Sequence, residues 1–276
     1  VTDRRMARPE WFVELIKRPF GHRFFLAKLT KLPILGSMVD HALFDGDDII
    51  YLPDDRMIRI DESIDPPEEM ALPSQVVEHF IRQASHHWIM DDCLCRDASQ
   101  CGHYPIDLGC LFLGEATQGI NPKLGRRVTM AEALAHTRRC REAGLVHMIG
   151  RNKLDTIWLG VGPGDRLLTI CNCCPCCCLW KMAPDVAPRI GAKIHRMPGV
   201  RVTVTESCTA CGACTRDVCF VDAISLSGHR AVVSEECRGC GRCVAACPQQ
   251  AIELAIEDDR FLENSITRLS TKVDVT

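Results

Sequence analysis

The chain has 276 residues, and 46% of them are hydrophobic, enough to fill the cores of about two domains and to exclude a disordered chain. Its formal net charge of −3 argues against a strongly basic nucleic-acid-binding protein. The 19 cysteines are odd in number and several are adjacent, which does not suit the disulfide framework of a small secreted protein. Metal ligation is the better interpretation of so many thiols.

No run of about 18 or more apolar residues occurs, so we expect no transmembrane helix. The twin arginine Arg4-Arg5 is followed by a polar segment and not by the apolar stretch of an export signal. The expected compartment is therefore the reducing cytoplasm.

Residues 1–70 are expected to form an N-terminal arm followed by an acidic segment. Lys and Arg dominate residues 1–31, whereas Asp and Glu dominate residues 40–70. Apolar side chains at helical spacing predict a helix that packs on its own domain: Trp11, Phe12, Leu15 and Ile16. The alternative is a basic amphipathic helix that docks on a membrane surface or a partner.

Two helices are predicted further along the chain. Ser74 is the expected N-cap of a helix that continues to about Ile89. Thr129 and Glu132 have the spacing of a capping box and predict the start of a second helix. Cys140 falls on the apolar face of that second helix, so we expect it in the core.

Three short β-rich runs predict a small sheet, at 145–149, 156–159 and 166–170. The last run leads directly into Cys171, so the sheet is expected to carry a cysteine-rich strand end. The glycines of 160–164 predict a turn and not a phosphate loop, because Pro163 removes a backbone donor and no Lys-Ser/Thr follows. Together these elements predict a Cys-rich domain of helices and strands over 71–197.

Residues 198–256 have the composition of a compact metal module. Two cysteine runs fill it, Cys208-x2-Cys211-x2-Cys214-x4-Cys219 and Cys237-x2-Cys240-x2-Cys243-x3-Cys247-Pro248. Three thiolates at two-residue gaps can wrap three corners of an iron–sulfur cube, while the fourth reaches across to the other cube. The expected ligand sets are Cys208, Cys211, Cys214 with Cys247, and Cys237, Cys240, Cys243 with Cys219. A pair of four-cysteine zinc sites is the weaker alternative.

At these residues the sequence resembles the bacterial two-cluster ferredoxin domain, over about 200–255. The resemblance implies a ferredoxin-like fold with two [4Fe–4S] clusters. One departure is that four residues precede Cys219, and Phe220 follows it, where the family usually has three residues and proline. Residues 257–276 are expected to form a C-terminal amphipathic helix and tail that fold back or dock on a partner.

The cysteines upstream of the module, except Cys140, are further candidate metal ligands. They are Cys93, Cys95, Cys101, Cys110, Cys171, Cys173, Cys174, Cys176, Cys177 and Cys178. Their crowding is costly without a metal, because adjacent thiols oxidise readily. In an extended segment Cys171 and Cys173 share one face, while Cys174 addresses another site. One or two more clusters are expected here, with zinc or thiol chemistry as the interpretation if none forms.

This upstream pattern, ahead of a ferredoxin module, resembles a group of largely uncharacterised iron–sulfur ferredoxin-like proteins of anaerobic microbes, over about 70–255. The resemblance implies anaerobic electron transfer without naming a substrate. Adjacent cysteines are also found in the CCG motifs of a heterodisulfide reductase subunit, but the repeated CCG blocks of that family are absent.

Few other residues suggest chemistry. His86 and His87 lie near Cys93 in the sequence, and His103 lies inside the first upstream cysteine group. His86 and His87 are candidate ligands or proton carriers, and His103 is a candidate to tune or ligate iron; an ordinary surface or core histidine is the alternative for each. Arg96 is a candidate donor to cluster sulfide or to an acidic partner.

The sequence therefore predicts an α+β iron–sulfur protein. In its leading function, single electrons pass between redox protein partners, or subunits of an oxidoreductase complex, in anaerobic metabolism. No nucleic-acid partner is expected, and peripheral contact with a membrane is left open. The alternative is a reductase whose catalytic cluster or redox-active thiols lie in the N-terminal Cys-rich domain. A third interpretation is a sensor whose metal occupancy changes with oxygen.

Overall fold

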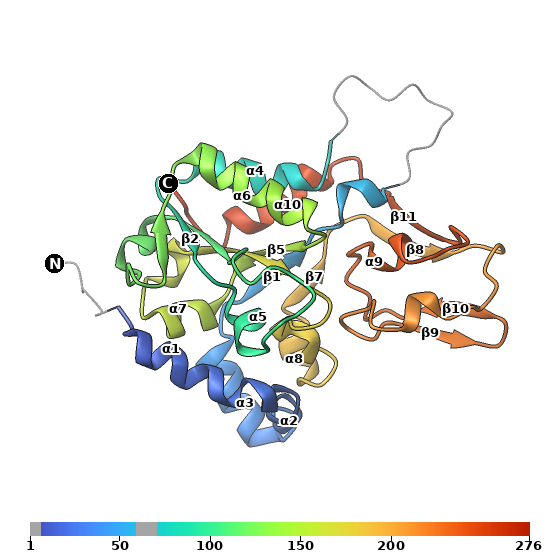
Figure 1. Ribbon diagram of the computed structural model, residues 1–276, viewed down its shortest axis with the longest axis horizontal. Coiled ribbons are helices and arrows are strands. Elements are labelled where there is room, and N and C mark those ends of the chain that lie inside the picture. The colour runs from blue at the N-terminus through green and yellow to red at the C-terminus, as the bar shows by residue number, and fades with distance from the viewer. Residues whose placement is uncertain (1–6, 59–70) are drawn as a thin grey trace.

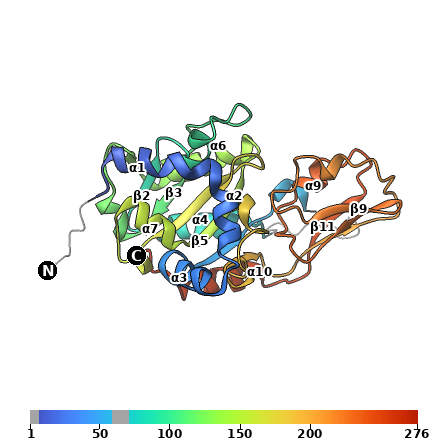
Figure 2. The same ribbon diagram turned by 90° about the horizontal axis from the view of Figure 1, so that it is seen from below.

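The computed structural model describes residues 7–58 and 71–276. The fold is α+β, as predicted from the sequence. Figure 1 shows a body of helices around a sheet and a smaller extension, coloured orange, and Figure 2 places that extension at one end of the body. The twin arginine Arg4-Arg5 and the acidic residues of 59–70 lie outside the described residues.

The body is built on a seven-stranded sheet with the strand order β4-β2-β3-β6-β5-β1-β7. Neighbouring strands are antiparallel, except that β1 and β7 are parallel. The strands are β1 (Asp48–Tyr51), β2 (His87–Met90), β3 (Leu111–Leu113), β4 (Gly125–Arg127), β5 (Val146–Arg151), β6 (Leu168–Cys173) and β7 (Ile194–Arg196). Every residue of β1 and β3 is buried, because helices cover both faces of the sheet.

The two helical layers lie on opposite sides of the sheet (Figure 1). One layer holds α4 (Ser74–Gln83), α6 (Met130–Glu142) and α10 (Phe261–Ser270). The other holds α1 (Glu10–Lys17), α2 (Arg23–Leu29), α3 (Pro33–Leu43), α5 (Leu94–Ala98), α7 (Lys153–Leu159) and α8 (Pro188–Gly191). Within the described residues, no helix combines the length and the apolar character needed to cross a membrane.

Several predicted elements are confirmed. Thr129 accepts a hydrogen bond from the Glu132 backbone N–H, and the Glu132 carboxylate accepts one from the Thr129 N–H, so the capping box begins α6 as expected. Cys140 is fully buried on this helix. The predicted C-terminal helix is present as α10, which packs against α4 and so folds back onto the body.

Two predicted elements are wrong. Residues 156–159 belong to α7 and not to a strand, because the Asn152 side chain caps the helix and Gly160 ends it in a left-handed conformation. The first predicted helix does not reach Ile89 but ends at Gln83. The Ser85 N–H then donates to the Val275 carbonyl oxygen, and the chain enters β2.

The predicted N-terminal helix is α1, and its apolar side chains are divided between two environments. Phe12 and Ile16 face a cavity in the body, whereas Trp11 is 67% exposed and Leu15 is 46% exposed. Its predicted packing on its own domain therefore holds for the first pair of side chains only.

The extension contains two small antiparallel sheets. β8 (Val200–Val204) pairs with β11 (Ile252–Ile256), and β9 (Ile224–Ser227) pairs with β10 (Arg230–Val233). Between the strands lie the short helices η6 (Ala213–Thr215) and α9 (Arg242–Ala245). This arrangement brings the beginning and the end of the extension together beside the body.

Candidate metal centres

The extension holds two cavities, each lined by cysteines from both runs. One is lined by Cys208, Cys211, Cys214 and Cys247. The other is lined by Cys219, Cys237, Cys240 and Cys243. The structure thus brings together the same two groups of four that the spacing predicts, with the fourth cysteine of each run crossing to the other group.

A glycine turn shapes each run locally. Gly212 and Gly241 follow the second cysteine of their runs and have φ angles of +74° and +81°, a region in which side chains other than glycine are strained. Each glycine caps a short helix, η6 or α9, that carries the third cysteine of its run. The turn therefore bends three thiols around one cavity.

Backbone N–H groups point at four of these sulfur atoms. Ala231 donates to Cys208 at 3.3 Å, and Ala223 donates to Cys219 at 3.2 Å. Gly239 donates to Cys237 and Ala251 to Cys247, both at 3.3 Å. Such donors stabilise the thiolate form, which is the form that binds metal.

The two cavities differ in their exposure to solvent. Cys211, in the first, is exposed, and hydrogen bonds from backbone N–H groups, that of Ala231 first, lower the pKa of Cys208. In the second, burial raises the pKa of Cys237 and raises that of Cys240 to about 11. A bound metal would have to displace protons from these buried thiols.

A third cavity, of about 290 Å³, lies in the body. Seven thiols line it, those of Cys93, Cys95, Cys110, Cys171, Cys173, Cys174 and Cys178. They come from the start of α5, the approach to β3, the end of β6 and the turn that follows it. Two of them, Cys110 and Cys171, bring their Sγ atoms to 3.6 Å, although they are 61 residues apart in the sequence.

Arg96 is a buried cation at the wall of this third cavity. Its side chain is 0% exposed and donates to the carbonyl oxygens of Leu108 and Asn172, at 2.5 Å and 2.7 Å. Its Nε has no hydrogen-bond partner among the described residues. A positive charge with a free N–H beside thiolates suits an anionic iron–sulfur cluster, whose sulfide accepts such bonds. The upstream residues therefore fit that cofactor.

The thiols also influence each other in this cavity. A hydrogen bond with Cys95 and the charge of Arg96 lower the pKa of Cys93 to about 6, against the opposing effect of burial. Of this pair, Cys93 is therefore the thiol that more readily forms the thiolate, while the pKa of Cys95 is raised.

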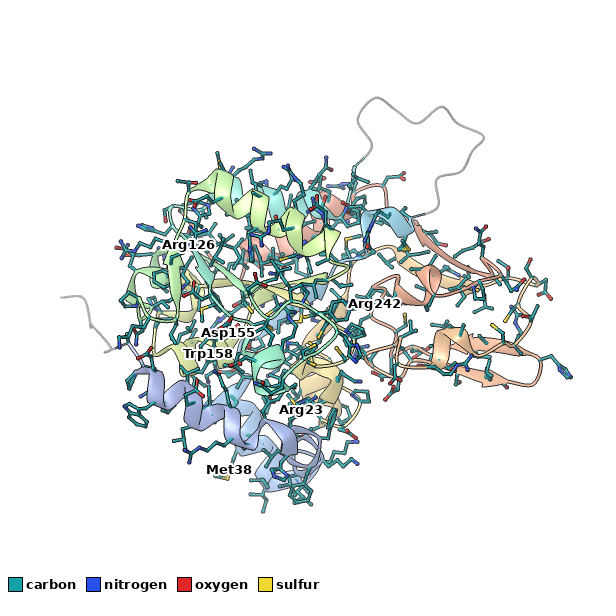
Figure 3. The ribbon with its side chains drawn as sticks, viewed as in Figure 1. Arg23, Met38, Arg126, Asp155, Trp158 and Arg242 are labelled. Carbon is teal, nitrogen blue, oxygen red and sulfur yellow. The ribbon has the colours of Figure 1, made fainter. Side chains whose placement is uncertain are left out.

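Apolar side chains complete the lining of the third cavity. Phe12, Ile16 and Trp158 line it, together with Asp155. Figure 3 labels Asp155 and Trp158, and the Trp158 Nε1–H donates to an Asp155 oxygen at 2.7 Å. The other oxygen of Asp155 accepts hydrogen bonds from Thr169 and Asn152, both at 2.8 Å. Asp155 is therefore committed to structural bonds and is not free for acid–base work.

The remaining upstream cysteines lie elsewhere. Cys101, Cys176 and Cys177 gather with Cys174 in a compact group whose Sγ atoms are all within 4.8 Å of one another. Cys140 packs nearby in an apolar cluster, where burial raises the pKa of its thiol to about 12. Cys140 is therefore a protonated core residue, as predicted.

Two contacts join the second cavity of the extension to the third cavity in the body. Phe220, next to Cys219, stacks on Tyr51 with ring centroids 4.4 Å apart. The Tyr51 hydroxyl lies 4.0 Å from Cys173 Sγ and 3.8 Å from Cys178 Sγ. Burial and these thiols raise the pKa of Tyr51, so the phenol keeps its proton and serves as a donor.

The second contact is made by Arg242. It follows Gly241 in the second run, and its guanidinium donates to the Cys173 carbonyl oxygen at 2.5 Å. Figure 3 shows Arg242 at the junction between the body and the extension. The roles of Tyr51 and Arg242 were missed at the sequence level, and only the unusual Phe220 gave a signal.

The three candidate histidines lie away from the thiol cavities or bond to other groups. His86 bonds to Ser85, and His87 bonds to the Ile81 carbonyl oxygen. His103 is exposed, and its backbone N–H, not its ring, donates to the Cys101 sulfur. Arg96, by contrast, lies where a donor to cluster sulfide was expected.

Residues 214–257 match the family model described as the LdpA Fe-S cluster-binding domain. No curated protein and no solved structure gives a significant match to the chain. The matched segment contains all four cysteines of the second cavity. Together with the cysteine-rich sites, the match supports an iron–sulfur cluster-binding protein.

Proposed function

We propose that this chain is an electron-transfer protein that carries single electrons between redox protein partners, as a ferredoxin-like subunit of anaerobic oxidoreductase systems. Three [4Fe–4S] clusters are proposed. Two are held by the crossed cysteine sets of a two-cluster ferredoxin domain, and the third by thiols of the cavity in the body. A bound cluster supplies a reversible one-electron store whose potential is set by hydrogen bonds and burial.

The observation that carries this proposal is the direct packing of one cysteine site on the next. Cys219, Phe220, Tyr51 and Cys173 follow one another across the junction between extension and body, through ring centroids 4.4 Å apart and a hydroxyl 4.0 Å from sulfur. Cysteines of both sites share one buried apolar cluster with these aromatic rings. The chain thus excludes water between two thiol sites, which suits electron exchange and not separate functions.

The outer end of this series also suits exchange with a partner. Cys211 of the first cavity is exposed, whereas thiols of the other two cavities are buried or half-buried. A redox protein can therefore approach the first site closely. We therefore propose that electrons enter or leave at the first cavity of the extension, and that the cavity in the body is the innermost of the three sites.

Iron and acid-labile sulfide per chain test the cofactor set on anaerobically purified protein. We expect about 12 iron and about 12 sulfide, four of each per cube. A redox titration followed by low-temperature EPR should then show about three one-electron steps. A value near 8 iron would remove the body cluster from the proposal, and no iron would remove the function.

A reductase is the second candidate, favoured by one observation. The third cavity has more thiols than one cube requires, and apolar side chains line it as well. Its volume of about 290 Å³ lies at the lower limit of small-molecule sites, before any cluster occupies it. Asp155, the carboxylate at its wall, is fully engaged in hydrogen bonds. Asp155 therefore offers no unengaged oxygen for proton transfer to a substrate.

Reduced protein distinguishes the two candidates. If the chain is an electron-transfer protein, electrons should leave the reduced chain only when an oxidised ferredoxin or flavoprotein is added. Disulfides and other small oxidised thiol compounds should leave its spectrum unchanged over many minutes. Stoichiometric or catalytic reduction of such a compound by the reduced chain would favour the reductase.

A further inference from the structure

Four thiols in the body form a group more compact than the sets around the cavities. The Sγ atoms of Cys101, Cys174, Cys176 and Cys177 all lie within 4.8 Å of one another. Cys176 Sγ is 3.6 Å from both Cys101 Sγ and Cys177 Sγ. Across residues 7–58 and 71–276, no other group of three or more His, Cys, Asp or Glu side chains is this compact.

The mutual closeness of all four thiols fits one metal ion and not a cube, whereas Cys110 and Cys171 of the third cavity are close only as a pair. A tetrahedral ion with metal–sulfur bonds of about 2.3 Å holds its ligands about 3.8 Å apart. In a [4Fe–4S] cube each thiolate binds a different iron, so the thiolates are separated by the width of the cube. Among the described residues, the crossed cysteine sets of the extension form no such compact group, which suits ligands of a cube.

The backbone around the group is arranged for thiolates. Cys174 and Cys177 have a C-x2-C spacing, and the Cys177 N–H donates to Cys174 Sγ at 3.2 Å. On the other segment, the N–H groups of His103 and Tyr104 donate to Cys101 Sγ. Cys174 and Cys177 are 2% and 7% exposed, which closes the group on the side of the core.

We infer that these four cysteines bind a single Zn²⁺ ion in a closed structural site. The ion replaces four thiol protons and is coordinated by four thiolates, which completes a tetrahedron and leaves no position for substrate. Zinc suits the site because it keeps one oxidation state while electrons pass through neighbouring cofactors.

The position of the site gives the ion a structural task, which rests on the proposed function of the third cavity. Cys101 lies between Cys95 and Cys110 in the sequence, and residues 174–177 lie between Cys173 and Cys178. The ion therefore ties together the two segments that supply the cavity with thiols. Its binding would fix these segments before or while a cluster is held.

Metal analysis of the full chain tests the inference. Protein purified anaerobically from cells supplied with both iron and zinc should contain about one zinc per chain. Cys101→Ser and Cys176→Ser should each lower the zinc content severalfold while leaving the iron of the extension in place. The matched control is Cys140→Ala, which removes a buried thiol from the same apolar cluster and should keep its zinc.

Zinc K-edge X-ray absorption on the parent protein needs no variant and is independent of folding defects. It should give four sulfur neighbours at about 2.3 Å and no iron neighbour. Loss of about four iron and four sulfide from Cys101→Ser, with zinc absent throughout, would overturn the inference and assign these cysteines to a cluster. Unchanged metal contents in both serine variants would overturn it as well. Either result leaves the iron count of the extension, and thus the proposed electron transfer, to be judged separately.

Discussion

The guanidinium of Arg242 donates a hydrogen bond to the backbone carbonyl oxygen of Cys173 across the junction between the extension and the body. Arg242 stands between Gly241 and Cys243 in the second cysteine run, and Cys173 lines the cavity in the body. The bond therefore connects a side chain of one thiol site to the backbone of another, between residues 69 positions apart in the sequence. It acts beside the stacked rings of Tyr51 and Phe220.

Arg242→Gln should loosen this junction without removing a thiol. A hydrogen bond to a charged donor contributes about 1.5–3 kcal/mol, and the partial exposure of Arg242 lowers the expected loss to about 1–2 kcal/mol. Hydrogen exchange at 171–173 should become faster, and electron exchange between body and extension should slow severalfold, with iron content unchanged. Arg216→Gln is the matched control, because Arg216 donates to the Cys211 carbonyl oxygen within one site. Equal effects of the two variants would contradict the role of the junction.

Tyr51→Phe should shift a reduction potential while keeping the aromatic stack. The variant removes a buried donor that lies 3.8 Å and 4.0 Å from two cavity sulfurs. Donors to sulfur favour the more negative, reduced state, so their loss lowers the potential. About 1 kcal/mol for the bond corresponds to about 40 mV for one electron.

Potentiometric titration followed by EPR measures this shift at the body cluster. Tyr104→Phe is the control, because Tyr104 is the other tyrosine of the chain and packs beside the compact thiol group. A potential that stays the same or rises in Tyr51→Phe would refute the donor role.

Arg96→Leu should empty the cavity in the body. The change leaves the carbonyl oxygens of Leu108 and Asn172 buried without their donor, at about 1–3 kcal/mol each, and removes the positive charge among the thiolates. Iron should fall by about four per chain, while the EPR signals of the extension persist. The exposed Arg82→Leu is the control, since it loses only a surface pair with Glu78. An Arg96→Leu protein that retains all its iron would contradict the assignment.

The sequence predicts the extension better than the junction for a physical reason. The crossed cysteine sets follow from two-residue gaps and a duplicated run, which are local features. Tyr51 meets Cys173 across 122 residues, and no local pattern marks that contact. Phe220 was visible as a departure from the ferredoxin pattern, but its meaning required the ring that it stacks on.

The upstream elements show the same limit. The run 156–159 is apolar enough for a strand or a helix. It forms a helix because Asn152 caps the start of α7 and Gly160 ends it. The first helix ends before Ile89, and the Ser85 N–H donates to the carbonyl oxygen of Val275, which is distant in the sequence. The capping box of α6 was predictable because it satisfies its own backbone within four residues.

Two buried groups near the sheet should give opposing effects of pH on stability. Burial lowers the pKa of His147 to about 4, so its neutral form is favoured in the folded chain. The resulting contribution to folding stability is fully present above about pH 6.5, the pKa of a histidine in the unfolded chain. It is lost as the pH falls toward 4. Burial raises the pKa of Asp47 to about 7, so its contribution is present below the unfolded pKa of about 4 and is lost as the pH rises toward 7.

Between about pH 4 and 6.5 the two slopes oppose each other, each about 1.4 kcal/mol per pH unit. Asp47→Asn keeps the oxygen that accepts from the Lys153 N–H and removes the ionisation. Relative to the parent, this variant should therefore gain stability as the pH rises through this window. Urea unfolding midpoints of variant and parent at pH 5.0, 5.5, 6.0 and 6.5 measure this difference in stability. Any loss of cofactor during unfolding affects both proteins and cancels in the comparison. A difference that stays constant across the four values would show that Asp47 is already ionised in the folded chain.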